Sequence, residues 1–180
     1  MKNFKTEAII LKRRNVGEAD KLLTIFSKKL GKIQVKAAGI RKLTSRRSPH
    51  VELFNLSELS LYQGRSMPIL TEVVSFKHFP EIKEDLTKVG FAYHICELID
   101  GLCAEGQENE YVYHLLAETF QRMCGQEDLL TIVHEFEIDL LTALGFYRHS
   151  EFTKTLNTQA FIEQILEKKL KTQRMLHKFS

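Results

Sequence analysis

The apolar residues of the first 76 positions follow the two-residue period of half-buried strands. Five such runs predict strands over residues 6–13, 21–27, 32–37, 51–62 and 69–76. The third run is the clearest, because Ile33 and Val35 would point inward while Lys32 and Lys36 share the outer face. In the fourth run the parity of the leucines changes, which predicts a β-bulge near Asn55. Five short strands separated by glycine-containing turns favour a small closed barrel, since closure removes exposed sheet edges.

Beyond Pro80 the apolar period becomes helical. The first predicted helix carries a stripe of Leu86, Val89, Tyr93 and Cys96. Further helices are predicted over about residues 110–123 and 127–144, and a last one begins near Thr158, which is interpreted as its N-cap. The sequence therefore predicts an α+β chain, with a five-stranded barrel over residues 1–79 and an all-helical domain over residues 80–180.

Charge is segregated along the chain far more than the net charge of +3 suggests. Residues 1–80 hold 16 Lys and Arg against 6 Asp and Glu, whereas residues 81–150 hold 4 against 14. A strongly basic half favours a polyanionic partner, with nucleic acid ahead of an anionic membrane. The acidic stretch would repel that same partner. We therefore expect the helical half to have another role, such as binding a protein.

The candidate nucleic-acid-binding residues are cations that fall in turns or on the outer face of the predicted barrel. They are Lys12, Arg13, Arg14, Lys21, Lys32, Lys36, Arg41, Lys42, Arg46 and Arg47. Residues 41–48 (RKLTSRRS) place four cations and three hydroxyls in one loop, which can neutralise phosphates and donate hydrogen bonds to them. A solvated surface loop is the alternative interpretation. Phe26 and Tyr62 are candidates for base stacking, although a core position suits Phe26 equally well.

No sequence pattern points to metal or catalytic chemistry. Cys96, Cys103 and Cys124 form no close pair of the kind structural zinc uses, so reduced core thiols are expected, and the histidines are interpreted as surface or capped residues. The sequence has no P-loop, GxSxG or HExxH motif, so the chain is predicted not to be an enzyme and to need no metal or cofactor. No apolar run suits a signal peptide or a membrane span, which favours the cytoplasm and no membrane role.

Several short segments share a recognisable pattern in a fixed order. In the barrel region they are residues 6–12 (TEAIILK), 17–27 (GEADKLLTIFS), 31–33 (GKI), 37–41 (AAGIR) and 59–71, which contains an L-Y-x-G turn. In the helical region they are residues 136–146 (FEIDLLTALGF) and 170–174 (LKTQR). Together, and over most of the chain, they resemble the RecO family of recombination and repair mediators.

This resemblance implies an OB-fold barrel followed by a helical domain. It also implies binding of single- and double-stranded DNA, annealing of complementary strands, and loading of recombinase onto strands coated with single-stranded-DNA-binding protein (SSB). The implied partners are RecR and the acidic C-terminal tail of SSB, and the implied location is the cytoplasm at the nucleoid. The SSB tail would bind in the helical half. The basic segment 168–179 could hold such an acidic, apolar-ended peptide, or it could pack on the helices as their tail.

The sequence departs from the family pattern in one place. Many members carry a four-cysteine zinc module after the L-G-[YF] signature, but residues 146–160 contain no cysteine, so zinc is expected to be absent. Two other functions fit the same charges. One is an OB-type module that binds RNA, and the other is an interaction adaptor that acts through its helical domain.

Overall fold

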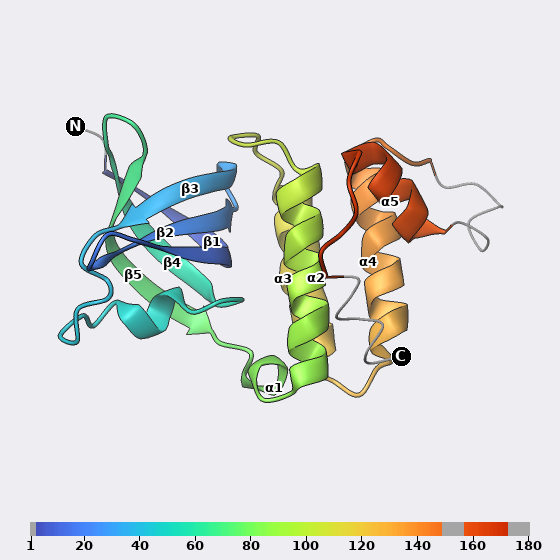
Figure 1. The fold of residues 1–180 in the computed structure, drawn as a ribbon, viewed down its shortest axis with the longest axis horizontal. Coiled ribbons are helices and arrows are strands. Elements are labelled where there is room, and N and C mark those ends of the chain that lie inside the picture. The colour runs from blue at the N-terminus through green and yellow to red at the C-terminus, as the bar shows by residue number, and fades with distance from the viewer. Residues whose placement is uncertain (1–2, 149–156, 173–180) are drawn as a thin grey trace. The chain divides into compact units, whose positions relative to one another are not determined.

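The computed structural model describes residues 3–148 and 157–172 (Figure 1). The chain divides into two compact units. The barrel unit comprises Met1–Phe79 together with Ala104–Tyr113, and the helical unit comprises Pro80–Cys103 and His114–Ser180. The sequence alone gave no sign that residues 104–113 belong with the barrel.

The barrel unit is built on five strands that close into a ring (Figure 1). The strands are β1 (Asn3–Val16), β2 (Asp20–Ser27), β3 (Gly31–Ala37), β4 (Leu56–Gln63) and β5 (Pro68–Lys77). Their order in the ring is β1-β2-β3-β5-β4, and the ring closes through one parallel pairing of Lys36 with Ile69. The prediction of a five-stranded OB-fold barrel followed by helices is confirmed.

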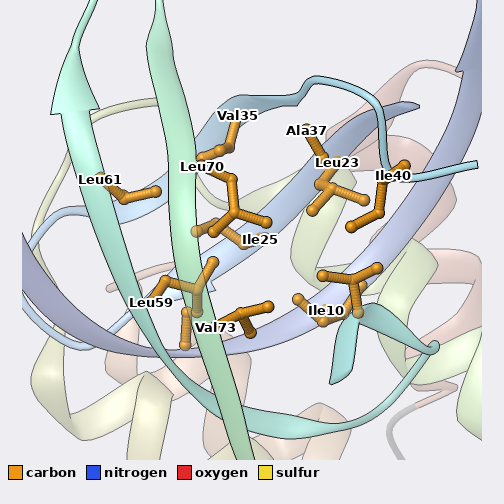
Figure 2. Close-up of a cluster of buried hydrophobic side chains, with 12 residues drawn as sticks. Ile10, Leu23, Ile25, Val35, Ala37, Ile40, Leu59, Leu61, Leu70 and Val73 are labelled. Carbon is orange, nitrogen blue, oxygen red and sulfur yellow. The ribbon is translucent and has the colours of Figure 1, made fainter. Parts of the chain in front are cut away.

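The long first strand shapes the barrel because it pairs with two neighbours. Residues Asn3 to Ile9 pair with β4, and residues Ala8 to Val16 pair with β2. The register with β2 shifts between Ile10 and Lys12, and such a bulge bends a strand and increases its twist. Inward side chains from all five strands, among them Ile10, Leu23 and Val35, meet in one buried cluster (Figure 2).

The prediction of a strand over residues 51–62 is wrong in its first part. Ser48–Val51 form a short 3-10 helix with Pro49 in its first turn, and β4 begins only at Leu56. Phe54 has a φ of 69°, which no extended strand can contain. An irregular connection thus precedes β4, and the register of β4 with β5 shifts between Leu56 and Ser57, close to the β-bulge predicted near Asn55.

Residues 104–113 are fixed to the barrel at the turn between β2 and β3. The Gly106 N–H donates to the Lys32 carbonyl at 2.8 Å, and Lys28 forms an ion pair with Glu110 at 3.2 Å. The Tyr113 hydroxyl donates to Glu7 on β1 at 3.3 Å. Burial, and then the Glu7 carboxylate, raise the pKa of Tyr113, so this hydroxyl stays protonated and remains a donor.

In the part of the chain that the structure describes, the helical unit contains five helices, of which α3 begins within the barrel unit. They are α1 (Pro80–Lys83), α2 (Leu86–Leu102), α3 (Glu110–Met123), α4 (Leu129–Ala143) and α5 (Thr158–Leu166). Side chains that accept backbone N–H groups cap four of them: Asp85 on α2, Asn109 on α3, Asp128 on α4 and Asn157 on α5. Thr158 is therefore the first residue of α5 and not its N-cap.

Two predictions for α2 are wrong. Leu86 and Tyr93, which were assigned to the buried stripe, are 70% and 38% exposed. His94, interpreted from the sequence as a surface or capped residue, is buried and hydrogen-bonded to Glu137 and Thr172. Only tertiary partners on other segments make a buried histidine tolerable, and those partners are distant in the sequence.

Two further observations bear on the predicted termini and membrane role. Of the basic segment 168–179, residues 173–179 lie outside the described residues, and Leu170 and Thr172 are buried. Within residues 3–148 and 157–172, no helix has the length and apolarity that crossing a bilayer requires.

Candidate nucleic-acid interface

Two basic segments of the barrel unit are tied together by hydrogen bonds that Arg41 donates from its backbone and from its side chain. The Arg41 N–H donates to the Ala19 carbonyl at 2.9 Å, and the Arg41 guanidinium donates to the Gly17 carbonyl at 3.0 Å. These bonds join the β1–β2 hairpin to the loop that follows β3. We call the result the hairpin–loop surface, which consists of residues 12–21 and 36–47. Segments that are separate in the sequence thus present their cations side by side.

Asp20 anchors this surface. One of its carboxylate oxygens accepts the Gly39 N–H at 2.8 Å, and the other lies 3.1 Å from the Lys36 ammonium. The Gly39 N–H, then Lys36 and more weakly Lys42, hold the pKa of Asp20 below its usual value. Asp20 therefore stays ionised. It fixes the turn at Gly39, whose φ of +65° favours glycine.

Three cations crowd together at the base of the hairpin. Burial, and then the positive charges of Arg13 and Arg41, lower the pKa of Lys21, although Glu52 opposes them. Arg13 is half-buried and paired with Glu52. The Glu52 carboxylate thus lies near both Arg13 and Lys21 and does not neutralise all three cations. An added anion would therefore reduce the repulsion between them.

The strand register places further cations on the outer face. Arg14 lies opposite Leu22, and Leu22 lies opposite Lys36, so the three form one row across β1, β2 and β3. Neighbouring strands are about 4.8 Å apart, so Arg14 and Lys36 are separated by roughly 10 Å. Lys12 lies in the adjacent row, opposite Thr24. All three cations are exposed, and an extended backbone could contact them in turn.

Arg47 has a different environment from its neighbour Arg46. The Arg47 guanidinium donates to the carbonyls of Leu70 at 2.8 Å and of Ala38 at 2.7 Å, and it is half-buried. It closes the basic loop against β3 and β5. Arg46 is exposed, and so is Lys42. The sequence could not separate these roles, because the two arginines are adjacent in one loop.

Of the ten predicted residues, Lys32 lies apart from the others. It pairs with Phe26 at the far end of β3 and forms a bridge with Glu105. Four residues of strand separate it from Lys36, which is roughly 13 Å. The structure therefore brings the other nine predicted cations together on the hairpin–loop surface and leaves Lys32 near residues 104–113.

The two aromatic candidates also differ. Phe26 is fully buried, so it has no free ring face for a base. Tyr62 is half-buried and shares a row with Ile69 and Lys36 through β5. Of the two, Tyr62 is the one that could contact a base.

A cavity of about 610 Å³ opens elsewhere in the barrel unit. Its lining is mostly apolar and includes Phe4, Leu30, Ile33, Pro68 and Gly106. Ile33 belongs to β3 and Pro68 to β5, two strands whose pairing is restricted to Lys36 and Ile69. The cavity thus lies on the side of the barrel where Lys32 is found.

Comparison with known proteins identifies the family. The model described as "Recombination protein O N terminal" matches residues 1–79, which contain the barrel strands and the hairpin–loop surface. The model described as "Recombination protein O C terminal" matches residues 83–151. The chain belongs to the RecO family.

Curated relatives agree with this assignment. The RecO-family chain is 34% identical over 146 residues to the DNA repair protein RecO of Pelotomaculum thermopropionicum, an alignment that covers 81% of this chain and 57% of the relative. It is 38% identical over 143 residues to that of a Roseiflexus species, with 79% and 50% covered. The protein from Alkaliphilus metalliredigens is 34% identical over 147 residues, with 81% and 60% covered. The chain thus spans about half to three-fifths of the length of these relatives.

Proposed function

We propose that this RecO-family chain binds single- and double-stranded DNA through the hairpin–loop surface and anneals complementary strands without hydrolysing a nucleotide. The observation that carries the proposal is the gathering of the cations Arg13, Lys21 and Arg41 around one carboxylate, Glu52, which pairs with Arg13 and also acts on Lys21. Clustered cations that repel one another in the free protein gain energy when phosphates approach.

The mechanism follows from charge. Two complementary strands repel each other through their phosphates, and this repulsion slows their encounter. The exposed cations Lys12, Arg14, Lys42 and Arg46 could neutralise one strand, while the remaining positive field attracts the second. Each neutralised phosphate on a single strand contributes about −0.7 to the slope of log K against log salt concentration. Four to six contacts therefore predict a slope of roughly −3 to −4.

The proposal also includes two protein partners, SSB and RecR. The chain would act on strands coated with SSB, bind the acidic SSB tail through its helical unit, and cooperate with RecR to load recombinase. What supports this is membership of the RecO family, together with a charge segregation that leaves residues 81–150 acidic and unsuited to phosphates. Such a mediator is not an enzyme, and it would work in the cytoplasm at the nucleoid.

The deciding experiment measures annealing of two complementary fluorescent oligonucleotides, first bare and then coated with SSB, without nucleotide or metal. The expected result is faster annealing in both cases. If the chain accelerated annealing of bare strands only, the result would support DNA binding and contradict the role on SSB-coated strands. Absence of DNA binding at low salt would overturn the proposal, and retained binding to the SSB tail would then favour an adaptor. Annealing of RNA as fast as DNA would favour an RNA-binding module.

A further inference from the structure

A fully exposed leucine, Leu43, lies in the middle of the basic loop. The loop closes a turn there, because the Ser45 N–H donates to the Lys42 carbonyl at 2.8 Å. Leu43 is the second residue of that turn, a position that many residue types can occupy. The local backbone therefore gives no reason for a large apolar side chain in water.

The loop presents this side chain in a fixed position. The Lys42 N–H donates to the Gly39 carbonyl at 3.2 Å, and the Ser48 N–H donates to the Ser45 carbonyl at 3.4 Å. Behind the turn, the Arg47 guanidinium holds the Ala38 carbonyl at 2.7 Å. Leu43 is thus held outward by a hydrogen-bonded loop, between the exposed cations Lys42 and Arg46.

A second exposed apolar residue lies on the hairpin. Val16 is 41% exposed and lies two positions beyond Arg14, on the same face of β1. The hairpin and the loop are bonded to each other through Arg41, whose guanidinium reaches the Gly17 carbonyl. Each half of the hairpin–loop surface thus offers an apolar side chain beside cations.

We propose that Leu43 is a base-contacting residue that packs against or between unstacked bases of a single strand, with Val16 beside it. This inference rests on the proposed DNA binding and adds a preference to it. A ligand that suits both features must combine closely spaced negative charges with accessible apolar surface. A single strand exposes its base faces next to its phosphates, whereas a duplex keeps them stacked. Leu43 thus makes the surface selective for single strands, which charge alone cannot do.

The test compares the wild-type chain with Leu43→Ala on three probes at several salt concentrations. The probes are a 20-nucleotide strand, its duplex, and an abasic strand that has the same phosphates without bases. We expect Leu43→Ala to weaken binding of the normal strand about fivefold, the low end of the effect of losing one stacked base. Binding of the abasic strand and the duplex should be unchanged, and the salt slope should stay the same. Leu86→Ala, which truncates a leucine 70% exposed in the helical unit, is the matched control.

The outcomes separate this inference from the proposed function. Unchanged binding of the normal strand by Leu43→Ala would overturn the base contact and leave the phosphate contacts in place. An equal loss on the normal and abasic strands would also overturn it, because the effect would then come from the shape of the loop. If Leu43→Ala lost the binding of the wild-type chain to vesicles containing phosphatidylglycerol while its DNA binding stayed intact, Leu43 would be assigned to an anionic membrane instead. If the wild-type chain binds none of the DNA probes, the proposed function fails first.

Discussion

His94 on α2 and Thr172 are 78 positions apart in the sequence, yet the His94 Nδ1 lies 2.8 Å from the Thr172 hydroxyl oxygen inside the helical unit. That hydroxyl donates to Glu97 at 2.7 Å, so it accepts its bond from the His94 Nδ1–H. On the other side of the ring, the Nε2 lies 2.9 Å from Glu137. This second bond needs one more proton, held by the imidazole or by the carboxyl. A buried polar chain therefore links α2, α4 and the segment after α5.

Replacing His94 by alanine should destabilise the helical unit. The change leaves the buried Glu137 without one hydrogen-bond partner and Thr172 without its donor, and such losses typically cost about 2–4 kcal/mol. The midpoint of urea unfolding followed by circular dichroism measures the effect. The matched control is His114→Ala, since His114 is exposed on α3. Equal midpoints for the two variants would show that the buried chain contributes nothing to stability.

The docking of residues 170–172 should weaken in acid. Burial alone would raise the pKa of the Glu97 carboxyl, but the N–H groups of Lys171 and Thr172 and the Thr172 hydroxyl together lower it. A carboxyl whose pKa is lower in the folded state contributes stability above its unfolded pKa of 4.5, and this stability is lost as the pH falls through the lowered value. Hydrogen exchange at the Thr172 N–H should therefore accelerate below about pH 4.5, beyond its ordinary pH dependence.

The Glu97→Gln variant tests this assignment. It keeps the shape of the side chain but removes its charge, so the extra acid-dependent exchange should disappear and exchange at neutral pH should already be faster. Glu118→Gln is the control, because Glu118 is exposed on α3. If Glu97→Gln keeps the acid dependence of the wild type, another group is responsible for it.

Local patterns in the sequence predicted most of the fold. The alternation in β3 and the turn residues predicted the barrel, because strand period and backbone conformation depend on neighbouring residues. The strand over residues 51–55 was predicted wrongly, since an apolar spacing can arise from a short helix as well as from a bulge. The burial of His94 depends on Glu137 and Thr172, which no local window contains.

The sequence predicted the positive charge of the candidate site, but it did not predict which cations face solvent and which hold the structure together. The count of cations indicates a basic surface whatever the fold. Which cations face solvent depends on the register and on the loop bonds. Arg47 donates to two carbonyls, and Lys32 lies at the far end of β3. Leu43 carried a signal that charge counting missed, namely a large apolar residue in the middle of a basic loop.

Gly31 should be intolerant of any side chain, since it lies against residues 104–113. Its φ is +64°, and a Cβ placed on it would lie 1.8 Å from the Gln107 carbonyl oxygen. Gly17 has a similar φ of +58°, but a Cβ there would meet nothing within 4 Å. Gly17→Ala should therefore cost only the left-handed strain, about 1 kcal/mol. Gly31→Ala should cost roughly 3 kcal/mol or more, because backbone must also move. Similar urea midpoints for the two variants would show that residues 104–113 can move away from the added Cβ with no loss of stability.

Changing Arg46 to glutamine should affect DNA binding, whereas changing Arg47 to glutamine should affect stability. Arg46 is exposed, so Arg46→Gln should leave the unfolding midpoint unchanged and reduce the magnitude of the salt slope for single-strand binding by about 0.7, the contribution of one phosphate. Arg47→Gln leaves the carbonyls of Leu70 and Ala38 without their charged donor, so it should lower stability by roughly 1–3 kcal/mol. Its effect on DNA should follow from the loosened loop and appear at every salt concentration. Salt titrations with a fluorescent strand, and urea titrations of the same variants, measure both quantities. The reverse pattern, with a stability loss for Arg46→Gln and only a salt-slope change for Arg47→Gln, would contradict these roles.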